Sequence, residues 1–281
     1  MKVILKDKNN EVRVLWVVLV SIVNFFVSIV GMNLLFLNLF PNNKILGYGL
    51  YCAAACTLSI VVTRFIGNYS FSKDRLQNMD FLFGKGLLSK ITSGFIIGLV
   101  TNGVWALICW YLGQLEIMYN GFNLEVFVIS FFAYLAVAVV EECTFRGLID
   151  TAFSKFGSVV GILSSSTMFA FMHGGLEEGG LAFIERFAFG ILFSLLMRRT
   201  HSLIFVVSAH FSHNFVYTAI AGIGETGRKT LFSTLFTSKA NFLAGSVDDG
   251  SLILILVLMA LVCITLFQMS KDNGKLNKVS A

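Results

Sequence analysis

Ionisable and amide side chains interrupt otherwise apolar stretches at three places in the second half of the chain. These are Glu141, Glu142 and Arg146 at the first place, His173 at the second, and His210 and Asn214 at the third. A charged or strongly polar group inside a lipid-embedded helix is costly, so each is a candidate functional group that needs a partner. The three places are therefore expected to share one pocket.

The spacing separates the two adjacent glutamates. Glu142 and Arg146 are four residues apart, so on a helix they share a face and are expected to form a buried ion pair. Glu141 points about 100° away around the helix and is left to face another helix. A carboxylate in that position can take a proton from water as a general base.

The other polar groups suit the remaining steps of amide hydrolysis. His173 can hold the same water or pass a proton to a leaving amine. His210 and Asn214 are also four residues apart, so their donors can converge on a developing oxyanion. The chain has no Gly-x-Ser-x-Gly, no Ser or Cys nucleophile beside a base and no His-Glu-x-x-His. Without these motifs, the residues favour hydrolysis by a water molecule that Glu141 activates.

Composition indicates that these groups lie in a membrane. Of the 281 residues, 56% are hydrophobic and only 13% are charged, and the mean hydropathy is +0.81, whereas about a quarter of a soluble domain is charged. The basic residues gather at the ends of apolar runs rather than on one face, which excludes a nucleic-acid-binding surface. The five cysteines show no Cys-x-x-Cys spacing and are interpreted as packing residues.

Apolar runs predict an all-α, polytopic membrane protein with about eight transmembrane helices, folded as a single membrane domain over 1–281. The runs fall near 14–38, 45–66, 88–112, 124–153, 157–174, 181–198, 201–221 and 250–270. The segment between Gly222 and Asp249 is expected to be an outer loop or a short interfacial helix. The polar groups cluster in 124–221, the predicted catalytic core.

A helix rise of about 1.5 Å per residue tests whether one pocket is possible. Counted from the inner ends of their helices, Glu141 lies ~21 Å deep and His173 ~24 Å deep. His210 lies ~15 Å and Asn214 ~21 Å deep. All four therefore reach the same slab of a hydrocarbon core about 30 Å thick.

The distribution of Lys and Arg predicts a cell-membrane protein with both termini in the cytoplasm. With the N-terminus inside, the outer segments hold only Lys44, Arg228, Lys229 and Lys239. The inner segments hold Lys2, Lys6, Lys8, Arg13, Arg64, Lys73, Arg75, Lys85, Lys90, Lys155, Arg198, Arg199, Lys271, Lys275 and Lys278.

The order of these motifs resembles that of a known family. Glu-Glu-x-x-x-Arg, then Phe-x-x-x-His, then His-x-x-x-Asn, on successive late helices, is similar to the CPBP family of CAAX prenyl endopeptidases and bacteriocin-processing enzymes, the Abi group. The matching residues are Glu141, Glu142, Arg146, Phe169, His173, His210 and Asn214. The similarity covers roughly 135–220, and the first three helices and the last have no specific match.

The resemblance implies an eight-helix intramembrane endopeptidase, long regarded as a metalloprotease and now usually as glutamate-dependent. Its substrate would be a membrane-embedded or lipid-anchored peptide, and its cellular task would be prenyl-tail trimming, bacteriocin self-immunity or peptide signalling. No cofactor is expected. His213 departs from the motifs as an additional imidazole that can replace or assist His210.

Two alternatives keep the same pocket. In the first, the protein binds a peptide or a sensor partner in the membrane without cutting it, as an immunity or regulatory protein. In the second, Glu141, His173 and His210 hold zinc with one position open for water.

Other polar and small residues have simpler interpretations. Glu185 and Arg186, near the outer end of the sixth span, are expected to snorkel or to form a salt bridge at the rim rather than to take part in catalysis. Gly94 and Gly98 are expected to allow close packing of helices.

Overall fold

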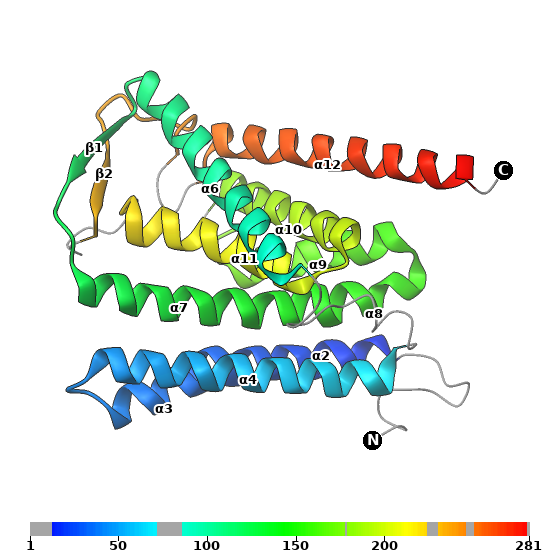
Figure 1. Cartoon of the computed structure of the whole chain (residues 1–281). Coiled ribbons are helices and arrows are strands. Elements are labelled where there is room, and N and C mark those ends of the chain that lie inside the picture. The colour runs from blue at the N-terminus through cyan, green and yellow to red at the C-terminus, as the bar shows by residue number, and fades with distance from the viewer. Residues whose placement is uncertain (1–12, 72–85, 178, 224–229, 246–249, 280–281) are drawn as a thin grey trace.

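The computed structural model describes residues 13–71, 86–177, 179–223, 230–245 and 250–279. The basic residues in 1–12, 72–85 and 224–229, which entered the orientation argument, lie outside the described residues. Within the described part the chain is almost entirely helical (Figure 1). This confirms the predicted all-α membrane fold.

Seven helical spans in the described part are long and apolar enough to cross a membrane. They are Val14–Leu39, Lys44–Ser70, Leu87–Tyr111, Leu124–Phe156, Gly180–Thr200, Leu203–Ile220 and Leu252–Asp272. Their bounds lie within a few residues of the predicted ones. Large apolar side chains point outward along them, such as Leu88 at 78% and Phe267 at 70% exposure, as expected of lipid-facing surfaces.

The predicted count of eight spans is not confirmed, because the fifth helix is short. Helix α9, Ser158–Met172, has 15 residues, or about 22 Å of length, and the hydrocarbon core is about 30 Å thick. Helix α9 is nevertheless the element that brings His173 to the centre of the molecule. It begins after Gly157, whose φ of 118° turns the chain back from the preceding span.

Several spans are built from more than one helical segment. The first comprises α2 (Val14–Phe26), the π-helix η1 (Val27–Gly31) and α3 (Met32–Leu39). The fourth comprises α7 (Leu124–Glu142), the π-helix η2 (Cys143–Asp150), α8 (Thr151–Phe153) and η3 (Ser154–Phe156). The span Leu203–Ile220 comprises α11 (Leu203–Asn214) and the π-helix η4 (Phe215–Ile220). The remaining spans are the helices α4 (Lys44–Ser70), α6 (Leu87–Tyr111), α10 (Gly180–Thr200) and α12 (Leu252–Val279).

Asparagine caps define the starts of two of these helices. The side chains of Asn43 and Asn123 each accept a hydrogen bond, at 3.1 Å, from the backbone N–H three residues ahead. Such caps satisfy a donor that the first turn leaves without a partner. The cap at Asn123 fixes where α7 begins, and α7 ends at the two adjacent glutamates.

The helices pack in layers around a central group. Helices α9, α10 and α11 lie between α7 on one side and α12 on the other, while α2, α3 and α4 form a separate layer beyond α7 (Figure 1). Helix α6 crosses the bundle obliquely and packs against α11. The central group therefore carries most of the polar residues singled out in the sequence.

A two-stranded antiparallel sheet lies at one end of the bundle and was not predicted. Strand β1, Leu115–Tyr119, pairs with β2, Phe232–Phe236, with Leu115 opposite Phe236. The segment expected to be a loop or an interfacial helix thus contains a strand. The sheet joins the end of α6 to the chain that follows α11.

Candidate active site

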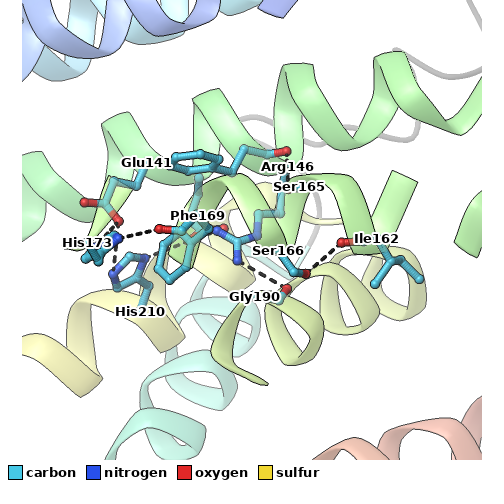
Figure 2. Close-up of polar contacts among 11 residues, drawn as sticks. Glu141, Arg146, Ile162, Ser165, Ser166, Phe169, His173, Gly190 and His210 are labelled. Atoms are coloured by element: carbon cyan, nitrogen blue, oxygen red, sulfur yellow. Dashed lines mark hydrogen bonds and ion pairs between the residues drawn. The ribbon is translucent and has the colours of Figure 1, made fainter. Parts of the chain in front are cut away.

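Three side chains from three separate elements meet inside the bundle. Glu141 stands at the end of α7, His173 directly follows α9, and His210 lies in α11. The distance from His173 Nε2 to Glu141 Oε2 is 3.4 Å, and that from His210 Nε2 to the same oxygen is 3.7 Å. Glu141 is only 4% exposed and His210 only 3%. Figure 2 shows both imidazole rings directed at this carboxylate.

A hydrogen bond at Nδ1 fixes the orientation of each imidazole. His173 Nδ1 is 2.8 Å from the carbonyl oxygen of Phe169, and His210 Nδ1 is 2.7 Å from Glu142 Oε1. Because both partners are acceptors, each Nδ1 carries the proton. In the neutral rings both Nε2 atoms are then acceptors that face Glu141.

Three acceptors therefore converge on one point. Glu141 Oε2 is buried and receives no hydrogen bond from the described residues. Lone pairs directed at one another repel unless a proton-bearing or cationic species lies between them. This point is where the side chains would hold a water molecule, with Glu141 as proton acceptor.

Glu142 has a larger role than its spacing suggested. The expected pair with Arg146 is present, with 3.0 Å between Arg146 Nη1 and Glu142 Oε1, and neither side chain is exposed. The same oxygen also accepts the hydrogen bond from His210. Sequence reasoning missed this second contact because His210 is 68 positions further along the chain.

Arg146 and Phe169 together hold the motif elements against α10. Arg146 Nη2 donates to the carbonyl oxygen of Gly190 at 3.2 Å, and its guanidinium lies 4.6 Å from the centre of the Phe169 ring. That ring in turn lies 4.4 Å from the ring of His173. Phe169 thus supports His173 through both its backbone oxygen and its side chain.

A cavity of about 220 Å³ adjoins these groups. It is lined by Phe169, His173, Glu185, Arg186, Phe189, Phe193, His210, His213, Asn214, Tyr217 and Leu254. Asn214 therefore shares one cavity with His173 and His210. Aromatic rings form most of the remaining wall, so the space suits a short stretch of apolar peptide.

Glu185 and Arg186 belong to this cavity rather than only to a rim. Glu185 Oε2 accepts a hydrogen bond of 2.7 Å from the backbone N–H of Ser251. Ser251 also receives the indole N–H of Trp105 at 2.9 Å. Glu185 thus connects α10 to the start of α12, a contact that the sequence did not indicate.

The donor set fits zinc in chemical type, since zinc accepts both imidazole and carboxylate ligands. The hydrogen bonds on both Nδ1 atoms are also of the kind that orient metal-binding histidines. Among the residues that the structure describes, however, no group of three or more His, Cys, Asp or Glu side chains is arranged to hold a metal ion.

Comparison with known proteins adds one match. Residues 123–216 match the model of the family described as type II CAAX prenyl endopeptidase, Rce1-like. Residues 123–216, about a third of the chain, are thus similar to the CAAX prenyl endopeptidases. The match begins at the cap of α7 and ends just after α11, so it contains every motif residue named above. No curated protein and no solved structure matches the chain.

This similarity associates the site with a class of chemistry. The family whose model matches the segment is described as prenyl endopeptidases. Helices α2 to α6 and α12 lie outside the matched segment.

Proposed function

We propose that this CAAX-type protease hydrolyses a membrane-embedded or lipid-anchored peptide with water activated by Glu141. The observation that carries the proposal is the convergence of two imidazole Nε2 atoms on Glu141 Oε2, within 3.7 Å, beside a cavity. A buried carboxylate flanked by two oriented imidazoles is suited to general-base catalysis.

In the proposed reaction, Glu141 takes a proton from water while the water oxygen bonds to the scissile carbonyl carbon. The carbonyl oxygen becomes an oxyanion, and the amide of Asn214, which lines the same cavity, would donate to it. His210 would contribute a second donor as the imidazolium, with a proton that it takes from solvent before the reaction and keeps throughout.

Collapse of the tetrahedral intermediate breaks the C–N bond. The leaving amine receives the proton, with His173 relaying it from Glu141. The products are a carboxylic acid and an amine, and the protein returns to its starting state.

Removal of the base is the direct test. Purified, reconstituted protein would be assayed on a prenylated CAAX peptide and on a panel of hydrophobic peptides. We expect Glu141→Gln to lower the cleavage rate by about 10²- to 10⁴-fold, the usual contribution of a general base. Glu125→Gln, in the first turn of the same helix and exposed, should cleave like wild type. Equal cleavage by wild type and Glu141→Gln on every substrate would overturn the mechanism.

A zinc-dependent protease is the alternative favoured by the ligand types. Glu141, His173 and His210 would hold the ion, which would polarise the scissile carbonyl and acidify water. Metal analysis of active protein decides between the metal-free and the zinc-dependent mechanism. Stoichiometric zinc, with activity lost on its removal and restored on its return, would replace the metal-free mechanism.

The cellular task is a further part of the proposal. From the family resemblance, we propose bacteriocin self-immunity or processing of a peptide signal. If the protein only binds its peptide partner, cells carrying Glu141→Gln or His173→Ala should keep their immunity or signalling. If it is a peptidase, these cells should lose that immunity or signalling.

A further inference from the structure

His213 is an imidazole beside the candidate active site that the proposed reaction does not use. It lies on α11, three residues after His210 and next to Asn214, and it lines the same cavity as both. It occupies a variable position within the third motif, His-x-x-x-Asn, so the family resemblance assigns it no role. The contacts of its ring and backbone indicate a separate role.

Rings on either side fix the orientation of the His213 imidazole. The Phe189 ring centre is 4.3 Å away, and the Tyr217 ring centre is 5.8 Å away. Aromatic contacts of this kind restrict a side chain to one orientation. The ring is therefore held in place before any ligand binds.

The backbone at His213 is fixed as well. Its carbonyl oxygen accepts a hydrogen bond of 2.8 Å from the side-chain amide of Asn102 on α6. Gly98 lies so close that a Cβ there would stand 2.6 Å from the His213 backbone nitrogen. These contacts with α6 fix this turn of α11, so the backbone that carries the imidazole is held in place.

The two ring nitrogens of His213 are in different surroundings. Nδ1 is buried and has no hydrogen-bond partner among the described residues, although the residue as a whole is partly exposed. A neutral imidazole has one N–H donor and one acceptor. A buried N–H without an acceptor is costly, so the proton is better placed on Nε2.

We propose that His213 is a substrate-binding residue whose Nε2–H donates a hydrogen bond to a backbone carbonyl of the peptide in the cavity, at a bond that is not cut. This proposal rests on the proposed peptidase function. The ligand chemistry is that of an extended peptide, whose carbonyl groups need donors once they leave water. Because this contact is the same before and during the reaction, it contributes to binding and leaves the chemical step unchanged.

Three substitutions of His213 separate the contributions of its atoms. Glutamine can place a donor near the position of Nε2, asparagine only near that of Nδ1, and phenylalanine keeps the ring without either nitrogen. We expect His213→Phe and His213→Asn to raise KM for the cleaved prenylated CAAX peptide, or for the best hydrophobic peptide of the panel, by about threefold to tenfold, the effect of losing one hydrogen bond. The kcat value should be unchanged, and His213→Gln should restore KM.

His201→Asn is the matched control, because His201 is exposed at the end of α10 and outside the cavity. Its φ of 50° is a conformation that asparagine tolerates. This variant should have the KM of wild type. Thermal unfolding of every variant would show that the fold is kept.

Binding separates this proposal from the peptidase proposal. The Kd of the same peptide would be measured on Glu141→Gln protein with and without the changes at His213. A Kd that rises with Phe and recovers with Gln supports the role of His213 even if cleavage is absent. An unchanged Kd with Phe, a failure of Gln to restore binding, or a loss confined to kcat would overturn it.

Discussion

Glu142 connects two parts of the site that have different functions. One of its oxygens contacts both Arg146 and His210, at 3.0 and 2.7 Å. The contact with Arg146 neutralises a buried cation. The contact with His210 fixes which nitrogen of the imidazole points toward Glu141. Under the proposed mechanism, stability and catalysis therefore depend on the same carboxylate through different partners.

Substitution of Glu142 should separate these two effects. Glu142→Gln removes the ion-pair partner of the buried guanidinium, so we expect a loss of about 3–5 kcal/mol of stability and a loss of cleavage. The double variant Glu142→Leu with Arg146→Met removes both charges and should recover most of the stability. It should stay inactive, because His210 still lacks its carboxylate.

Thermal unfolding and peptide cleavage, measured on the same preparations, check this prediction. Cleavage restored together with stability in the double variant would mean that Glu142 acts only as the partner of Arg146.

At the scale of elements, α6 determines where α11 can lie. Ser208 and Ser212 on α11 donate to backbone carbonyls of α6, each at 2.7 Å. A Cβ on Gly94 would stand 2.3 Å from the Phe205 carbonyl oxygen, and one on Gly98 would stand 2.4 Å from that of Ala209. The expected close packing therefore occurs against the helix that carries His210 and Asn214, which gives these glycines an indirect role in the site.

Gly98→Ala and Gly103→Ala form a matched pair on α6. Gly103 has no other group within 4 Å of an added Cβ, so alanine there should be neutral or stabilising by up to about 1 kcal/mol. Alanine at Gly98 must push α11 away, with a cost of about 1–3 kcal/mol. We expect Gly98→Ala to reduce peptide cleavage at temperatures where the protein stays folded.

Unfolding and activity assays on both glycine variants provide the measurement. If the two variants cleave equally, the position of α11 does not depend on this contact.

Sequence patterns predicted the helices better than the contacts between them. Apolar runs located the spans to within a few residues because the thickness of the bilayer imposes a length that is visible locally. The pairing of β1 with β2 joins Leu115 to Phe236, far along the chain, and no local pattern specifies such a pair. The same holds for Glu142 with His210 and for Glu185 with Ser251. The common depth of Glu141, His173 and His210 could be predicted, whereas the orientation of each ring could not.

At the scale of the whole molecule, α2 begins and α12 ends at the same end of the bundle (Figure 1). The two-stranded sheet lies at the opposite end. The sequence predicts that the end of the bundle where α2 begins and α12 ends faces the cytoplasm, and this orientation stays a prediction. It would place Lys155 and Asp272 on the cytoplasmic side of the membrane and Ser238, which follows β2, on the outer side.

Single introduced cysteines test this orientation, in a background where the exposed Cys263 is replaced by alanine. In intact cells, a membrane-impermeant maleimide should label Ser238→Cys only. Lys155→Cys and Asp272→Cys should react after the inner face is opened to the reagent. The reverse pattern would invert the topology, and opposite behaviour of the two inner positions would contradict the arrangement of the helices.

The π-helix η2 has a consequence for chain length. The span that contains it has 33 residues, far more than the roughly 20 needed to cross lipid, so shortening its ends by one residue should be tolerated. Within Cys143–Asp150 the i→i+5 bonds accommodate an extra residue, so a deletion there would let ordinary i→i+4 bonds form and would rotate the flanking segments much less than the roughly 100° that a deletion in an α-helix causes. A deletion within the α-helical part, Leu124–Glu142, would instead turn the residues before it relative to those after it by that full angle. The tolerance of this span to deletions is therefore set by rotational phase, and the π-helical segment is where one residue can be removed with the smallest change of phase.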